Sequence, residues 1–298
     1  MNPMIKTVSM PLTMVVGALL CRPVMALDVA CGHMLTPVLI FLMLFYTFCR
    51  VDIRSMRIEP IHLRLLLFQL ILSILLYLLL YRIDAVVAQG ALICVLTPVA
   101  MAAVVIGGML GANITTMATY SLLCNFTIAL VAPVVLSVVG NGECTFLQIF
   151  MKVVPLLIMP FVAAQLFRVV SPRMSGWIAE HSQITFYLWL LSLIVIVGRT
   201  TTFIIDFRGA DPWTEISLAV VALLICIMQF VLGRRIGRRY GDAVAGGQSL
   251  GQKNTVLAVW MSQAFLDPLS SIAPTAYIIW QNFVNSFQIY RKDRKNRK

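Results

Sequence analysis

A single lysine stands in a polar stretch late in the chain. Lys253 follows Gln252, precedes Asn254 and comes four residues after Ser249, while most residues around this group are apolar. An ammonium group among amides and hydroxyls can balance or bind an anion, and in a bilayer such a charge faces a cavity or the protein interior. Lys253 is therefore the centre of the candidate site. The plainer alternative is a lysine whose stem reaches the cytoplasmic interface.

Two glycine-rich stretches resemble each other about half a chain apart. Residues 107–115 read GGxLGxNxT, and residues 246–255 read GGxxLGxxNT. Amides and hydroxyls beside glycines are costly in hydrocarbon unless the freed backbone and the polar side chains line a cavity. The two stretches therefore predict two broken helices that meet at one site. The alternative is that the glycines only allow helices to pack closely.

The remaining reactive residues form no catalytic or metal-binding pattern. No two acidic residues have the spacing of a general acid/base pair, the three histidines are isolated, and the seven cysteines include no CxxC pair. We predict no catalytic residue, no metal ligand and no cofactor, so the chain is not expected to be an enzyme. An intramembrane enzyme and a non-transporting membrane sensor remain as alternatives.

The composition places these residues in a membrane protein. Of the 298 residues, 60% are hydrophobic and 12% are charged, and the mean hydropathy is +0.92. A soluble protein carries about twice that share of charge, so a water-facing exterior is excluded. The net charge of +11 is assigned to cationic cytoplasmic loops rather than to nucleic-acid binding.

Ten apolar segments separate at clusters of charge, glycine and proline. A spanning helix needs about 20 apolar residues. The fourth segment is too long for one straight helix, so we expect it to unwind where Pro98, Gly107, Gly108 and Gly111 interrupt it. The predicted spans are 9–27, 35–49, 63–81, 86–121, 125–140, 146–167, 183–205, 213–233, 244–265 and 269–289.

The basic residues divide unequally between the two sides of a ten-span chain. With the tail at 290–298 in the cytoplasm, seventeen basic residues fall inside and five outside. This asymmetry predicts that both termini and the loop at 234–239 are cytoplasmic and that the loop at 206–215 is outside. A cleaved signal peptide is the alternative for the first span, although Arg22 interrupts its apolar run.

Ten spans divide into two halves of opposite orientation, because each half has an odd number of helices. Inverted repeats of this kind are found in many secondary transporters. The predicted fold is an all-α membrane protein with one transmembrane domain over 1–298. Repeat 1 covers about 9–140, repeat 2 covers about 146–289, and a basic cytoplasmic tail covers 290–298.

Short motifs follow one another in a specific order from about residue 35. They are Gln69, then Thr119-Tyr120 with Asn125, then Gln252-Lys253-Asn254 with Leu257-Ala258, and finally Trp280-Gln281-Asn282 with Ser286. In these motifs the chain resembles the bile acid:sodium symporter family. The resemblance implies ten helices in two inverted five-helix repeats, with broken helices 4 and 9 crossing near the midplane. It also implies inward transport of bile acids or small carboxylates with sodium.

The chain departs from the family where the resemblance places sodium ligands. The family has an acidic residue at the position of Ser249, a glutamine at that of Lys253 and a Ser-Asn pair at that of Thr115-Thr116. Sodium, like other hard cations, needs oxygen ligands and negative charge. A charged lysine a few ångströms away would repel it by about 4 kcal/mol at an effective dielectric of about 20. We therefore predict that sodium is not bound at these positions.

Two roles for Lys253 remain open. As a fixed cation it replaces sodium, braces the crossing helices through Gln69, Ser249 and Thr115, and leaves an anion carrier that is not coupled to sodium. Alternatively, burial destabilises the charged form of the lysine, so that its protonation is linked to substrate binding and a proton takes the part of sodium. A sodium-coupled symporter with rebuilt ion sites is a further alternative.

The function predicted from the sequence is transport of an organic anion. We expect a secondary carrier or facilitator in the bacterial inner membrane that moves a bile-acid-like anion or a small carboxylate by alternating access. Its partners are the anion and the lipid bilayer, with no nucleic acid, and no oligomeric state is predicted. Amide donors in a dry cleft can bind a carboxylate, so the substrate contacts are assigned to Asn113, Asn254, Gln281 and Asn282. The ion-site or charge-substituting residues are Gln69, Thr115, Thr116, Ser249, Gln252 and Lys253.

Overall fold

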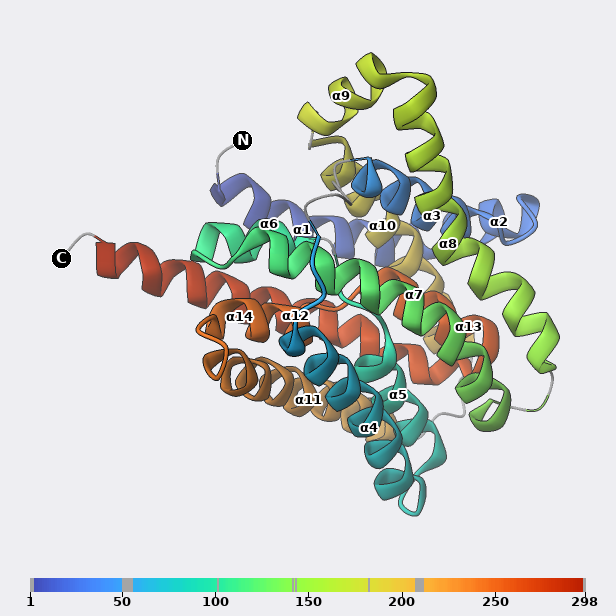
Figure 1. The fold of residues 1–298 in the computed structure, drawn as a ribbon. Helices are drawn as coiled ribbons and strands as arrows, with labels where there is room; N and C mark the ends of the chain where they lie inside the picture. The colour runs from blue at the N-terminus through green and yellow to red at the C-terminus, as the bar shows by residue number, and fades with distance from the viewer. Residues whose placement is uncertain are drawn as a thin grey trace.

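The computed structural model describes residues 3–49, 56–100, 102–140, 142, 144–181, 183–206 and 212–296. Over these ranges the regular elements are helices and no strand is formed, so the all-α prediction is confirmed there (Figure 1). The elements are α1 (Pro3–Leu19), α2 (Cys21–Ala30), α3 (Leu35–Phe48), α4 (Pro60–Tyr81), α5 (Ala85–Leu96), α6 (Ala102–Leu110), α7 (Ile114–Val139), α8 (Phe146–Val170), α9 (Pro172–Glu180), α10 (Gln183–Asp206), α11 (Pro212–Arg238), α12 (Ala243–Gly251), α13 (Thr255–Phe265), the 3-10 turn η2 (Pro268–Ser271) and α14 (Ile272–Asn296).

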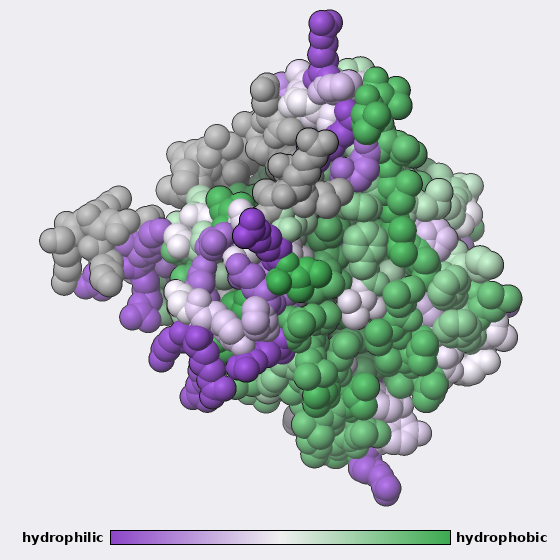
Figure 2. Space-filling view, in the orientation of Figure 1, coloured by the Kyte–Doolittle hydropathy of each residue, from purple (hydrophilic) through white to green (hydrophobic). Residues whose placement is uncertain are grey.

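Several of these helices are long and apolar enough to cross a bilayer. Five meet that test within the described residues, namely α4, α7, α8, α10 and α11, and the pair α1 and α2, bent by 75°, makes a sixth. Helices α3, α5 and α13 are apolar but shorter. Figure 2 shows a broad apolar surface, with hydrophilic residues gathered around the end of the molecule at which α14 ends. These features are those of an integral membrane protein.

The count of ten spans and the sidedness of the loops stay predictions. Half of the loop at 206–215, residues 207–211, lies outside the described residues, as do the basic residues at 50, 54, 297 and 298. The charge asymmetry is therefore a property of the sequence alone.

The boundary between the predicted fourth and fifth spans is wrong. The first interruption follows α5. Pro98 lacks a backbone N–H and restricts the residue before it to extended backbone, and Thr97 accordingly has a ψ of 141°. The chain is interrupted again at the turn between α6 and α7, where Gly111 has a φ of 88°, a value that favours glycine. Helix α7 then begins at Ile114, well before the predicted start at residue 125.

The glycines of the second glycine-rich stretch pack helices together and do not break one. Gly246 and Gly247 lie inside α12, against α11. A Cβ atom on Gly246 would lie 2.3 Å from the carbonyl oxygen of Gly233 in α11, and the reverse distance is also 2.3 Å. The helix unwinds only at 252–254. The close-packing alternative therefore applies to these two glycines.

This backbone contact gives a first test. We expect Gly246→Ala to lower the apparent melting temperature in detergent by about 6 °C or more, because overpacking of about 3 kcal/mol must be relieved by separating α11 from α12. Gly176→Ala in α9 is the matched control, since a Cβ there meets no atom within 4 Å. Equal melting temperatures for the two variants would show that α11 and α12 are not in backbone contact.

The helices form two groups that we call the first and second bundles. The first bundle contains α1, α2, α3, α8, α9 and α10, and the second contains α4, α5, α6, α7, α11, α12, α13 and α14 (Figure 1). Helices α7 and α8 connect the bundles, and α10 also contacts α13 and η2. Apolar residues of α4, α5, α11 and α14 form a shared core in the second bundle, including Leu72, Val95, Ile225 and Tyr277. Both interrupted helices belong to this bundle.

Candidate functional site

The break between α5 and α6 lies against the break between α12 and α13. The amide of Ala100 donates to the carbonyl of Gln252 at 3.0 Å, and the amide of Asn254 donates to the carbonyl of Pro98 at 2.9 Å. Val99 and Lys253 thereby form an isolated antiparallel bridge. Each extended stretch satisfies backbone groups that have no partner within their own helix. Two interrupted helices from different halves of the chain are thus joined at their breaks.

Side chains from three other segments cap the end of α5. The last carbonyls of a helix lack intrahelical partners and carry the negative end of its dipole. Gln69 of α4 donates to two of them at 2.9 and 3.1 Å, Gln229 of α11 to one at 3.3 Å, and Lys253 to one at 2.8 Å. The carbonyls belong to Cys94, Val95, Leu96 and Thr97. This end of α5 is therefore suited to a cation.

Lys253 lies where the two breaks meet. Only 1% of its surface is exposed, which is the opposite of what a lysine reaching the interface would show. Its Nζ donates to the carbonyl of Val95, and its amide donates to Oε1 of Gln281 at 3.0 Å. None of the ion pairs among the described residues involves Lys253. Among the described residues, the side chain of Lys253 thus contacts a helix-end carbonyl, that of Val95, and forms no ion pair with a carboxylate.

Two buried tyrosines support the breaks from the two halves of the chain. The hydroxyl of Tyr120 in α7 donates to Oε1 of Gln69 at 2.9 Å. The hydroxyl of Tyr277 in α14 donates to the carbonyl of Gly251 at 2.8 Å and accepts from Gln229 at 3.0 Å. Sequence analysis did not select Gln229 or Tyr277. A pattern in the sequence could have indicated them, because each half has a glutamine in an apolar segment followed about 50 residues later by a tyrosine.

Buried amides join α12 to α14 beside Lys253. Nε2 of Gln248 donates to Oδ1 of Asn285 at 2.9 Å, and Nδ2 of Asn285 donates to Oε1 of Gln252. Ser249, inside α12, is also buried. Gln252 and Ser249 thus belong to the packed support of the break. Their side chains do not face an open cavity.

The predicted substrate residues fall in two places. Asn254 caps α13 by accepting from the amide of Leu257 at 3.3 Å and is half-buried. Gln281 is buried and Asn282 is half-buried, one residue further along α14. Asn113 is exposed at the start of α7, where its amide donates to Asp242 at 2.7 Å. The nine residues of α6 separate it from the break by about 14 Å.

Thr115 and Thr116 lie with Asn113 and not with Lys253. The amide of Thr116 donates to Oδ1 of Asn113 at 3.1 Å, and the carbonyl of Thr116 lies 3.0 Å from Nε2 of His62. Thr115 and Thr116 lie at this point because Asn113 caps the start of α7. The structure therefore brings Gln69, Gln252, Lys253 and Gln281 together, with Asn254 next to Lys253 in the chain and Ser249 one helical turn before it. It leaves Asn113, Thr115 and Thr116 at the far end of α6.

No family model matches this chain, and no curated protein matches it significantly. The geometry of the site then indicates its chemistry. The buried ammonium of Lys253 and the N-terminal end of α13 both place positive charge at the paired breaks. Asn254, which is half-buried, lies between them in the chain. A carboxylate that reached Asn254 would meet amide donors and a positive field without any arginine at the break.

Proposed function

We propose that the protein is a secondary carrier or facilitator that moves an organic anion across the bacterial inner membrane by alternating access. The observation that carries the proposal is the pairing of two helix breaks around the buried Lys253. Broken helices whose ends meet at one point form the binding sites of many secondary transporters. A buried charge in such a place lowers stability, and charges of this kind usually serve substrate or ion movement.

The arrangement of the helices supports a carrier with inverted repeats. Counting α1 with α2, α5 with α6 and α12 with α13 as single interrupted spans gives ten, with α9 as a short additional helix. The interrupted spans then take the fourth and ninth places. Gln69 with Tyr120 in one half and Gln229 with Tyr277 in the other are matched supports. These matched pairs support our proposal of the architecture that the resemblance to bile acid:sodium symporters implies.

The charges at the breaks favour a carrier that is not coupled to sodium at the family's usual positions. Lys253 places a charged group on one of the helix-end carbonyls, that of Val95, and Ser249 supplies no negative charge. Sodium beside a charged lysine would be disfavoured by about 4 kcal/mol. A lysine that changes protonation during the cycle would couple transport to protons instead. A sodium-coupled carrier, a sensor and an intramembrane enzyme are the competing functions, and only carriers produce solute flux.

Transport in liposomes tests this function. Anions are first ranked by thermal shift in detergent, with taurocholate as the bile-acid-like probe and pyruvate as the small carboxylate, since a ligand of the folded state raises its stability. The stabilising anion should then enter proteoliposomes. Replacing sodium with choline at constant ionic strength should change its apparent affinity by less than about threefold, well below a tenfold change or 1.4 kcal/mol.

Two results would contradict parts of the proposal. A sodium-specific gain of tenfold or more would mean that other oxygens rebuild a sodium site. Binding without flux, for every anion that shifts the melting temperature, would favour the sensor or the enzyme.

A further inference from the structure

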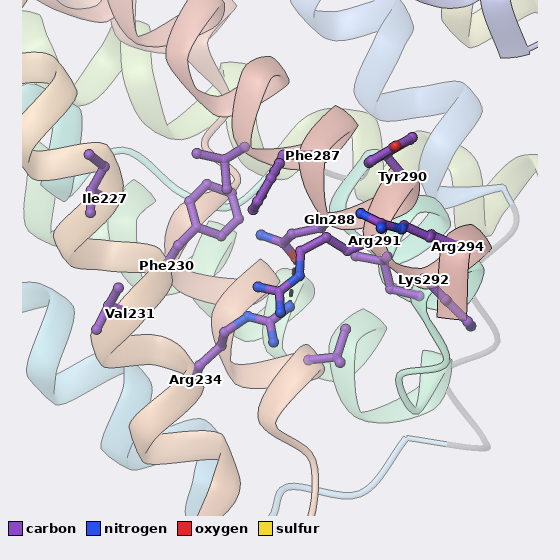
Figure 3. A pocket seen from close by; sticks show the side chains of 13 residues that line it. Ile227, Phe230, Val231, Arg234, Phe287, Gln288, Tyr290, Arg291, Lys292 and Arg294 are labelled. Carbon is purple, nitrogen blue, oxygen red and sulfur yellow. Dashed lines mark hydrogen bonds between the residues drawn. The ribbon is translucent and has the colours of Figure 1, made fainter. Parts of the chain in front are cut away.

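An open groove lies between α11 and α14, near the end of α14 (Figure 3). It has a volume of about 1230 Å³. Its apolar part is lined by Ile227 and Val231 from α11 and by Val284 and Phe287 from α14. Ile227 is 47% exposed and Phe287 is 59% exposed. This part of the groove thus joins exposed apolar side chains of α11 and of α14.

The other end of the groove is strongly basic. Its residues are Arg234, Arg291, Lys292 and Arg294. Figure 3 shows the side chains of Arg234 and Arg291 approaching each other beside Gln288, to which Arg234 donates a hydrogen bond of 2.8 Å. The guanidinium of Arg234 is repelled by Arg291 and by Arg238. None of the ion pairs among the described residues includes any of these cations.

These two features together specify one kind of ligand. Two guanidinium groups at close range are matched by a phosphate, which accepts bidentate hydrogen bonds from arginine. The adjoining apolar wall fits hydrocarbon chains, which a soluble phosphate lacks. Basic pockets between membrane helices on the cytoplasmic side are suited to anionic lipid headgroups, and the sequence predicts this end of α14 to be cytoplasmic.

We propose that the groove between α11 and α14 binds an anionic phospholipid. The headgroup phosphate lies between Arg234 and Arg291, and the acyl chains lie along Ile227, Val231 and Phe287. The site is separate from the paired breaks and does not depend on the transport function. Gln288, the partner of Arg234, lies 3.4 Å from Nε2 of Gln248 in α12. A bound headgroup therefore fixes α14 against α11 and α12.

The test is a thermal shift in neutral detergent with added lipid. Phosphatidylglycerol should raise the apparent melting temperature of the wild-type protein by about 5 °C at saturation, by the linkage between binding and stability. Phosphatidylcholine and free glycerol 3-phosphate should give less than a fifth of that shift. In Arg234→Gln/Arg291→Gln the concentration of phosphatidylglycerol needed for half the shift should rise at least tenfold. Arg82→Gln/Arg173→Gln is the control that removes equal charge elsewhere and should match the wild type.

A second variant separates the lipid from a small anion. Val231→Trp fills the apolar wall and keeps both arginines, so it should abolish the phosphatidylglycerol shift. An equal shift from phosphatidylcholine, or an unchanged half-saturation in the double arginine variant, would overturn the proposal. A shift from glycerol 3-phosphate as large as that from phosphatidylglycerol would replace the lipid by a soluble phosphate and would equally overturn it.

Discussion

Lys253→Met is expected to reduce anion transport at least a hundredfold while leaving the amount of folded protein nearly unchanged. Methionine keeps the length of the side chain but removes the charge that faces the end of α5. The carbonyl of Val95 then loses its donor, which lowers the free energy of unfolding by about 1–3 kcal/mol. Removing a buried charge raises it and offsets this loss. Folding is thus largely preserved, whereas the positive field at the breaks is lost.

Initial uptake rates in proteoliposomes measure this effect between about pH 5.5 and 8, the range in which a titrating lysine would change charge. Lys152→Met, at an exposed lysine in α8, is the matched control and should transport at the wild-type rate. If Lys253→Met transports at that rate across the whole range, Lys253 has no part in coupling and is only a packing residue.

Two substitutions at the breaks together are expected to make transport depend on sodium. Lys253→Gln removes the charge that repels sodium but adds no negative ligand, so it should not become sodium-dependent. Ser249→Glu combined with Lys253→Gln supplies both residues that the resemblance implies for sodium binding. We expect sodium to stimulate the double variant and not the single one. Sodium stimulation of Lys253→Gln alone would show that the breaks already hold enough oxygen ligands.

Joining the two bundles covalently is expected to stop transport. In the proposed carrier we expect alternating access to move the first bundle relative to the second. Oγ1 of Thr200 in α10 lies 3.4 Å from Oγ1 of Thr275 in α14, and Gln263 of α13 donates to Thr200 at 3.2 Å. Cysteines at positions 200 and 275 are therefore close enough to form a disulfide with small adjustments.

Oxidation of Thr200→Cys/Thr275→Cys should lower uptake at least tenfold, and a reducing agent should restore it. The control pair is Asp84→Cys/Thr214→Cys, whose native side chains approach to 3.5 Å within the second bundle; its disulfide should leave uptake unchanged. Each single variant controls for the seven native cysteines. Full uptake through the oxidised 200–275 pair would mean that transport proceeds without relative movement of the bundles.

The bounds of several helices were predictable, because long apolar runs bounded by charge and proline leave little choice. The predicted spans at 35–49, 146–167 and 183–205 agree with α3, α8 and α10 to within a few residues. The error fell between 86 and 125, because α7 runs without a break from Ile114 to Val139 although the predicted spans divided it at 121–125. Sequence alone does not show that Gly246 and Gly233 lie inside two helices that touch at these residues.

The candidate site was predictable only in part. Lys253 and Gln252 stood out as polar residues in an apolar run, the resemblance added Gln69 and Gln281, and the four do come together. Asn113 stood out for the same reason but begins α7, because a capping asparagine and a ligand-binding asparagine look alike in sequence. The supports Gln229 and Tyr277 act through contacts between distant segments, which no local motif specifies.

The mutual pairing of the two breaks has a consequence for biosynthesis. The stretch after α5 emerges from the ribosome about half a chain before the stretch after α12, yet each satisfies the backbone of the other. At about 5–20 residues per second the first half waits on the order of ten seconds with exposed polar groups in or beside the membrane. The halves therefore complete their folding only after both have been inserted. We expect an N-terminal fragment ending before residue 252 to be degraded, and we expect a co-expressed C-terminal half to restore its accumulation.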